Sequence, residues 1–214
     1  MVELNVVEAR VLGSLMEKEI TTPEYYPLSL NALVNACNQK SSRDPVMELG
    51  EADVRTALFD LEGLGLVKTI ADTRVSKFEH RTRDGLNLRR DEVAVICLLL
   101  LRGPQTSAEL RARSERLYSF DDNNAVLSTL ERLAAREEPF TAVLPRQPGA
   151  REVRWVHLLS GAVSEATSAP PREEAPNTGL VQRIEELEKL VRSLEQRLAA
   201  LEGSGAANQN SASE

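Results

Sequence analysis

The sequence is poor in the residues from which metal and redox sites are commonly built. Its 214 residues include two cysteines and two histidines, and no cysteine–histidine pair has the spacing of zinc ligands. Cys37 and Cys97 both lie in apolar helical patterns, where a free thiol usually packs as a small buried side chain in a reducing compartment. We therefore expect no metal, no cofactor and no disulfide.

Long hydrophobic segments and catalytic motifs are missing too. The longest apolar run, residues 93–101, is too short to cross a bilayer. The N-terminal stretch MVELNVVEAR has no basic-then-apolar signal pattern. The sequence contains no GxSxG and no glycine-rich phosphate loop. These absences predict a cytoplasmic protein that is not an enzyme and has no membrane partner.

The first 90 residues contain three helical patterns followed by a hairpin. Apolar residues recur at spacings of three and four in residues 7–20, 30–37 and 51–63, which is the period of a helix. Ser29 can cap the second helix, while Gly63 and Gly65 end the third. Residues 66–81 then alternate as two strands. Three helices and a hairpin predict a winged helix.

The same pattern recurs in residues 91–160. Helices are expected at 91–102, 108–116 and 123–136, with Ser107 capping the middle one, and a second hairpin follows at 140–158. The two halves can be overlaid at six apolar positions. These are Val11, Leu12 and Leu15, which match Val95, Ile96 and Leu99, and Val54, Leu58 and Leu61, which match Val126, Leu130 and Leu133. Two copies of one supersecondary unit are the simplest explanation.

The composition changes after Gly161. Residues 161–179 are rich in proline and lack periodic apolar residues, so we expect a disordered linker. Residues 180–202 then follow a heptad, which predicts a coiled-coil helix and a homo-oligomer, in the simplest case a homodimer. An amphipathic helix folded back on its own domain is the alternative. Residues 203–214 should be a disordered tail. The expected seam consists of Ile184, Leu187, Val191, Leu194, Leu198 and Leu201.

The predicted fold class is therefore mainly α with small β-hairpins (α+β). It comprises two tandem winged-helix domains, at residues 1–90 and 91–160, followed by the linker, the coiled-coil helix and the tail.

Charge is distributed unevenly along the chain. The formal net charge is −7, which does not suit a dedicated nucleic-acid binder. Residues 68–90, however, contain seven basic and three acidic residues, so the first hairpin and its exit are locally positive. Cations there can contact phosphates, or they can pair with nearby acids on a solvated hairpin. The connector NQKSSRDP, residues 38–45, also carries amides and cations, which can bind nucleic acid or simply cap helices.

The third helix is acidic, which weighs against simple insertion into a DNA groove. Glu51, Asp53, Asp60 and Glu62 accompany a single Arg55. We therefore expect contact with duplex DNA through the hairpin and the connector, or else a role as a protein adaptor that binds a basic partner. The candidate nucleic-acid-binding residues are Lys40, Arg43, Arg55, Arg74, Lys77 and Arg81.

Three stretches resemble the bacterial YceH-like family, an uncharacterised family of tandem winged-helix proteins. They are TTPEYYPLSLNALVNACNQKSSRDPVMELGEADVR, RVSKFEHR and AVICLLLLRGPQTSAELRARSERLYSF. The resemblance covers residues 7–159, and the heptad segment is expected to lie outside it. It implies the same two-winged-helix architecture and no particular activity.

Overall fold

The computed structural model describes residues 2–71, 75–146, 152–161, 189 and 192–193. The chain divides into two compact units, Met1–Ser168 and Ala169–Glu214. The described residues of the second unit, 189 and 192–193, are helical. All six predicted seam positions lie outside the described residues, as do residues 162–179 of the linker and the 203–214 tail. The coiled coil and the domain boundaries therefore stay predictions.

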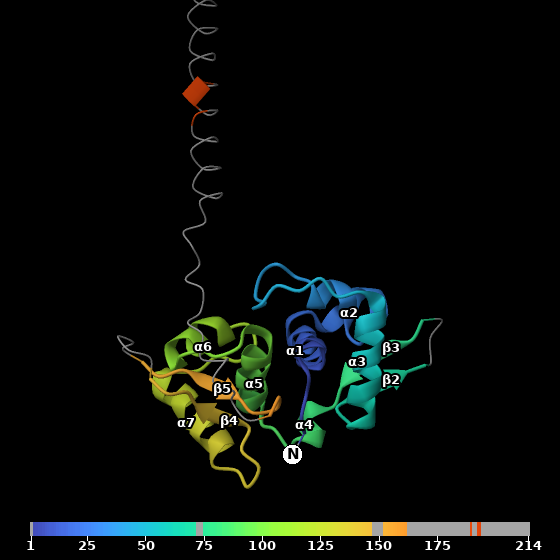
Figure 1. The fold of residues 1–214 in the computed structure, drawn as a ribbon. Coiled ribbons are helices and arrows are strands. Elements are labelled where there is room, and N and C mark those ends of the chain that lie inside the picture. Colours follow the sequence, from blue (N-terminus) through green and yellow to red (C-terminus); the bar gives the residue numbers. More distant parts are fainter. Residues whose placement is uncertain (1, 72–74, 147–151, 162–188, 190–191, 194–214) are drawn as a thin grey trace, which may run out of the picture. The chain divides into compact units, whose positions relative to one another are not determined.

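The N-terminal unit combines helices with small antiparallel sheets, as the sequence predicts (Figure 1). Its first half contains α1 (Val6–Thr21), the short 3-10 helix η1 (Pro23–Tyr25), β1 (Leu28–Ser29), α2 (Leu30–Cys37), α3 (Glu51–Gly63), β2 (Val67–Ile70), β3 (Lys77–His80) and α4 (Thr82–Gly85). Its second half contains α5 (Arg90–Arg102), α6 (Ser107–Ser114), α7 (Asn123–Ala134), β4 (Thr141–Val143) and β5 (Trp155–His157).

The strands of both halves follow one scheme. In the first half the order is β1-β3-β2, with β3 antiparallel to both neighbours. In the second half β4 pairs with β5, and Gln105, which precedes α6, forms an isolated antiparallel bridge with Trp155 of β5. Gln105 thus occupies the place of β1. Both predicted hairpins are confirmed, whereas β1 and α4 are elements that the sequence analysis does not predict.

Local capping explains where several helices begin. Asn5 accepts hydrogen bonds from the backbone of α1 and shares a reciprocal capping box with Glu8. Ser29 caps α2, as expected. The cap of α6 is Thr106 rather than the predicted Ser107, because the Thr106 hydroxyl accepts from the backbone of Glu109. Ser107 is instead the first helical residue, and its hydroxyl accepts a hydrogen bond from Asn123.

The positions that the overlay pairs are buried in both halves. The overlay pairs six residues of α1 and α5, and six of α3 and α7. All twelve lie in the core, and none is more than 4% exposed. The two halves therefore use the same positions of equivalent helices to build their interiors.

The two halves meet where α1 packs against α5, side by side at the centre of the unit (Figure 1). The crossing depends on Gly13. A Cβ atom at this position would lie 3.0 Å from the side chain of Leu101 and 3.2 Å from that of Leu100. The thiol of Cys97 lies 3.4 Å from the carbonyl oxygen of Gly13. A side chain at this position would require Leu100 and Leu101 to shift by a few tenths of an ångström.

We predict that Gly13→Val lowers the free energy of unfolding by about 2 kcal/mol, because the added methyl groups overpack the helix crossing. The matched control is Gly63→Val at the end of α3, where an added Cβ meets nothing within 4 Å. Urea unfolding of both variants measures the difference. Equal stability of the two variants would show that the crossing tolerates expansion.

Candidate nucleic-acid interface

The first hairpin is anchored at its base and extends away from α3 (Figure 1). Its register pairs Val67 with His80 and Ile70 with Lys77. β1 covers the other edge of β3 by pairing Leu28 with Phe78. β3 is therefore the central strand, and the hairpin is held to the body of the unit by β1 and α1.

The candidate cations of the hairpin differ in how freely they face solvent. Lys77 is half-buried at the start of β3. The guanidinium of Arg81 lies 2.7 Å from Glu79 and 4.0 Å from Asp84, so neighbouring carboxylates partly offset its charge. Arg74 lies outside the described residues. The hairpin thus presents a positive charge that is smaller than the count of basic residues suggests.

A buried histidine fixes the end of β3. The Nε2 atom of His80 lies 2.8 Å from a carboxylate oxygen of Glu19, and its Nδ1 atom lies 2.7 Å from the hydroxyl of Thr82. Its backbone N–H donates to the hydroxyl of Tyr26 at 2.7 Å. The hydrogen bond from His80 is the main reason that the pKa of Glu19 is lowered. The sequence analysis missed this cluster, because its four members are distant in sequence or unremarkable within it.

Two of the four acidic residues on α3 form hydrogen bonds that stabilise the fold. Asp53 accepts a hydrogen bond from the backbone N–H of Gly50 at 2.8 Å and so caps the helix. Glu62 accepts from the backbone and the hydroxyl of Thr69, at 3.0 and 3.2 Å, and so ties α3 to β2. The candidate Arg55 pairs only loosely with Glu51 at 3.8 Å, and both side chains are more than 60% exposed. Its guanidinium is therefore open to solvent.

In the structure the connector spans the whole loop between α2 and α3, residues 38–50, and a buried ion pair organises it. The side chain of Arg43 is inaccessible to solvent. Its guanidinium binds both carboxylate oxygens of Glu17, at 3.1 and 2.6 Å. It also donates to the carbonyl of Ala36 at 3.1 Å. Arg43 is a candidate phosphate ligand in the sequence analysis, but the structure places it in the interior, where it supports the connector.

Two further side chains close the connector. Asn38, which ends α2 as the sequence suggests, exchanges two hydrogen bonds of 2.8 Å with the backbone of Leu49. Arg10 of α1 donates to the carbonyls of Cys37 and Pro45, at 3.1 and 2.6 Å. Arg10 was not a sequence candidate, although a charged residue among the apolar positions of an amphipathic helix is a signal that could have identified it.

The structure does not bring the connector and the hairpin together. Ser42 accepts a hydrogen bond from Arg102 at 3.0 Å, and the backbone N–H of Asp44 donates to Leu101 at 2.9 Å, so the connector lies against the end of α5. The strands β2 and β3 lie on the other side of α3 (Figure 1). Lys40 is exposed near the start of the connector. The connector and the strands of the hairpin therefore lie on different sides of α3 (Figure 1).

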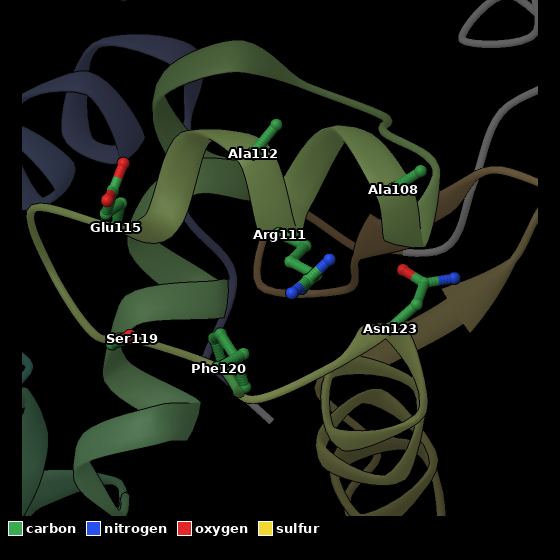
Figure 2. Close-up of a pocket in the computed structure, with 7 residues that line it drawn as sticks. All are labelled: Ala108, Arg111, Ala112, Glu115, Ser119, Phe120 and Asn123. Atoms are coloured by element: carbon green, nitrogen blue, oxygen red, sulfur yellow. The ribbon is translucent and has the colours of Figure 1, made fainter.

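The second half has an open hollow where α6 faces the start of α7 (Figure 2). Its volume is about 540 Å³. Figure 2 shows Arg111 and Asn123 on opposite elements beside the hollow, with Phe120 below them. Arg111 donates to the carbonyl of Asp121 at 2.9 Å, and Glu115 brings the opposite charge to the lining. This mixed lining does not select for one sign of ligand charge.

Within the described part of the chain, no group of three or more side chains is arranged to hold a metal ion. No described helix is long and apolar enough to cross a membrane. Cys37 and Cys97 are free and buried, as predicted, and burial raises the pKa of both thiols. Raised pKa values disfavour the reactive thiolate.

Comparison with known proteins identifies the relatives of this chain. Residues 4–150 match the family described as a protein of unknown function, DUF480. A UPF0502 protein of Koribacter versatilis is 52% identical over 192 residues, which cover 89% of this chain and 90% of the relative. The UPF0502 protein YceH of Escherichia fergusonii is 48% identical and covers 93% of this chain and 96% of the relative.

The similarity also extends beyond the two repeated halves. A UPF0502 protein of Aeromonas hydrophila is 48% identical, and the match covers 94% of this chain and 98% of the relative. A match to 94% of a 214-residue chain spans about 201 residues and so reaches into the heptad segment. The family match thus ends before the heptad segment, whereas the match to this relative continues into it.

We predict that Glu17→Gln lowers the free energy of unfolding by about 3 kcal/mol, because it leaves the buried Arg43 without its counter-ion. The control is Glu51→Gln, which removes only a loose, exposed pair and should change stability little. Urea unfolding at pH 7 distinguishes the two. A loss of similar size in both variants would contradict a special role for Glu17.

The same pair predicts a dependence of stability on pH. Burial alone would raise the pKa of Glu17, but hydrogen bonds and charge from Arg43 outweigh it and lower the pKa below its ordinary value of 4.5. A lowered pKa adds stability above that ordinary value, and this stability is lost as the pH falls through the folded-state pKa. Between pH 6 and 3, the unfolding free energy of the wild type should therefore fall more steeply than that of Glu17→Gln. Parallel pH profiles would rule out this linkage.

Proposed function

Because this chain belongs to the DUF480 family of proteins of unknown function, we propose its role from its own residues: it is a non-enzymatic, DNA-associated, regulator-like protein of two winged helices. The observation that carries the proposal is an element order that occurs twice: three helices followed by a β-hairpin. A DNA-associated role also requires the cytoplasmic location expected from the sequence.

The topology supports the winged-helix assignment. A helix-turn-helix unit presents its second helix to DNA, and a winged helix adds a hairpin beside that helix. In the first half, α2 and α3 supply the helical pair, while β2 and β3 supply the hairpin. In the second half, α6, α7, β4 and β5 repeat the arrangement, and the Gln105 bridge repeats the pairing of β1.

The proposed DNA contacts centre on the first hairpin. Lys77, Arg81 and, from the sequence, Arg74 supply cations that can contact phosphates, and Arg55 is exposed on the adjacent α3. Lys40 is an outlying contact on the connector. Such contacts give affinity for duplex DNA without reading its sequence. The carboxylates of α3 oppose deep entry into a groove, so we propose shallow binding that depends strongly on salt.

Self-association through the heptad segment would compensate for weak individual sites. A short coiled coil that joins two chains puts two hairpins on one duplex, and the second contact then forms at a high effective concentration. This part of the proposal rests on the sequence of residues 180–202.

A protein-adaptor role is the alternative, and one observation favours it. Phe59 lies on α3 among acidic residues and is 77% exposed, which is unusual for a large apolar side chain. An exposed aromatic residue on an acidic helix suits a basic partner protein with an apolar anchor.

We predict that Lys77→Ala with Arg74→Ala weakens binding to duplex DNA and flattens its salt dependence. Each lost phosphate contact should reduce the slope of log affinity against log salt by roughly one unit. The measurement is fluorescence anisotropy over a salt series. The charge-matched control, Arg111→Ala with Arg116→Ala, removes two exposed cations of the second half. An equal loss in the control would show that the contact surface is not on the first hairpin. No binding at low salt would contradict DNA binding altogether and leave the adaptor role.

We predict that Leu194→Asp lowers the molar mass measured by light scattering at concentrations on the order of tens of micromolar, because it places a charge in a three-heptad seam. Ser193→Asp adds the same charge one residue away, outside the seam, and should leave the mass unchanged. Removal of residues 180–214 should reproduce the effect of Leu194→Asp. A full-length protein that is already monomeric would show that the segment packs within its own chain.

A further inference from the structure

A second hollow lies where α1, the connector, the end of α5 and β5 meet. Its volume is about 250 Å³, and its lining is mostly apolar, with Met47, Leu100 and Val156 among its residues. Four polar side chains, Arg10, Asp44, His157 and Ser160, also line it, and Asp44 is exposed to solvent. We call it the α1–α5 pocket. Its size suits a ligand smaller than a typical drug molecule.

Arg10 is a buried cation that forms no ion pair with a described carboxylate. The residue is 2% exposed, and its two terminal nitrogens are bonded to backbone carbonyls, which are neutral. Its Nε atom is buried and has no partner among the described residues. Burial lowers the pKa of its guanidinium, and the charge of Arg43 lowers it further, whereas the nearby Cys37 and Asp44 act in the opposite direction. Arg43 has Glu17 as its partner, but no carboxylate of the described residues forms an ion pair with Arg10.

His157 brings a second unsatisfied group to the same lining. Its Nδ1 atom is buried and has no hydrogen-bond partner in the described part of the chain. Burial lowers the pKa of His157 to about 4, so the ring is neutral near pH 7 and one of its nitrogens carries a proton that it can donate. A buried ring nitrogen without a partner is costly, and a ligand that hydrogen-bonds to the ring removes that cost.

We propose that the α1–α5 pocket binds a small carboxylate with an apolar body, whose carboxylate group accepts hydrogen bonds from Arg10 and His157. The anionic group supplies an ion-pair partner for Arg10, while the apolar body contacts Met47, Leu100 and Val156. Such a ligand touches both halves of the unit at once and so stabilises the packing of α1 against α5. The proposal is independent of DNA binding.

Benzoate is the first probe, and benzamide is its uncharged counterpart of nearly equal shape. Binding to the full-length protein at pH 7 is followed by NMR of the His157 ring, which is assigned with a His157→Asn variant. The other histidine, His80, lies in the hairpin anchor and serves as an internal reference. We expect a saturable shift of the His157 signals with benzoate, with a dissociation constant on the order of 1 mM. Benzamide should bind roughly tenfold more weakly, since it lacks the charge that Arg10 favours.

Two neighbouring substitutions locate the binding site without altering Arg10. Met47→Trp fills the pocket and should abolish the benzoate shift. Val46→Trp places the same side chain at an exposed position that does not line the pocket, and should preserve the shift. Equal binding of benzoate and benzamide would overturn the assignment of a carboxylate. A missing His157 response, or one that Met47→Trp leaves intact, would overturn the site itself.

Discussion

The close approach of α1 and α5 at Gly13 is the constraint on which the rest of the unit depends. The absence of a side chain there brings Leu101 and the thiol of Cys97 against the backbone of α1. Each helix is also the first helix of its half, so the same contact joins two copies of one supersecondary unit into a single core. It sets the position of the end of α5, against which the connector packs. The glycine is therefore a packing requirement rather than a conformational one, since its φ angle is not in the left-handed region.

Sequence periodicity predicts the longer helices and both hairpins but not the short α4, because burial imposes a spacing of three or four residues that is visible locally only over several turns. Features without a local signal were missed. β1 is two residues long and exists because Leu28 and Ser29 meet β3, nearly fifty residues later. The cap of α6 was misplaced by one residue because Thr106 and Ser107 have the same capping chemistry. For the candidate site, residue type identifies the cations but not their burial. Arg43 and Arg55 are the same residue type, yet Arg43 is buried and Arg55 is exposed.

The acidity of α3 has a structural component that charge counting does not reveal. Asp53 and Glu62 hold the start of the helix and the adjacent strand, so their carboxylates have partners within the fold. In α7, by contrast, the first turn carries no acid. The two equivalent helices have therefore diverged on their outer faces while keeping the same buried positions. Their shared core argues for a common fold, and their different surfaces argue that the halves do not make the same contacts with a partner.

A single helix connects the features that bear on function. α1 contributes Gly13 to the crossing with α5, and Arg10 to the connector and the α1–α5 pocket. One turn further on, Glu17 holds Arg43, and Glu19 holds His80 at the base of the hairpin. These contacts lie along little more than two turns of one continuous helix, which behaves as a rigid element over that length. A displacement of α1 against α5 would therefore strain both the hairpin anchor and the connector, which is also bonded to the end of α5. The α1–α5 pocket lies beside the same crossing, so a ligand bound there, as proposed above, would stabilise the packing of α1 against α5 on which both contacts depend.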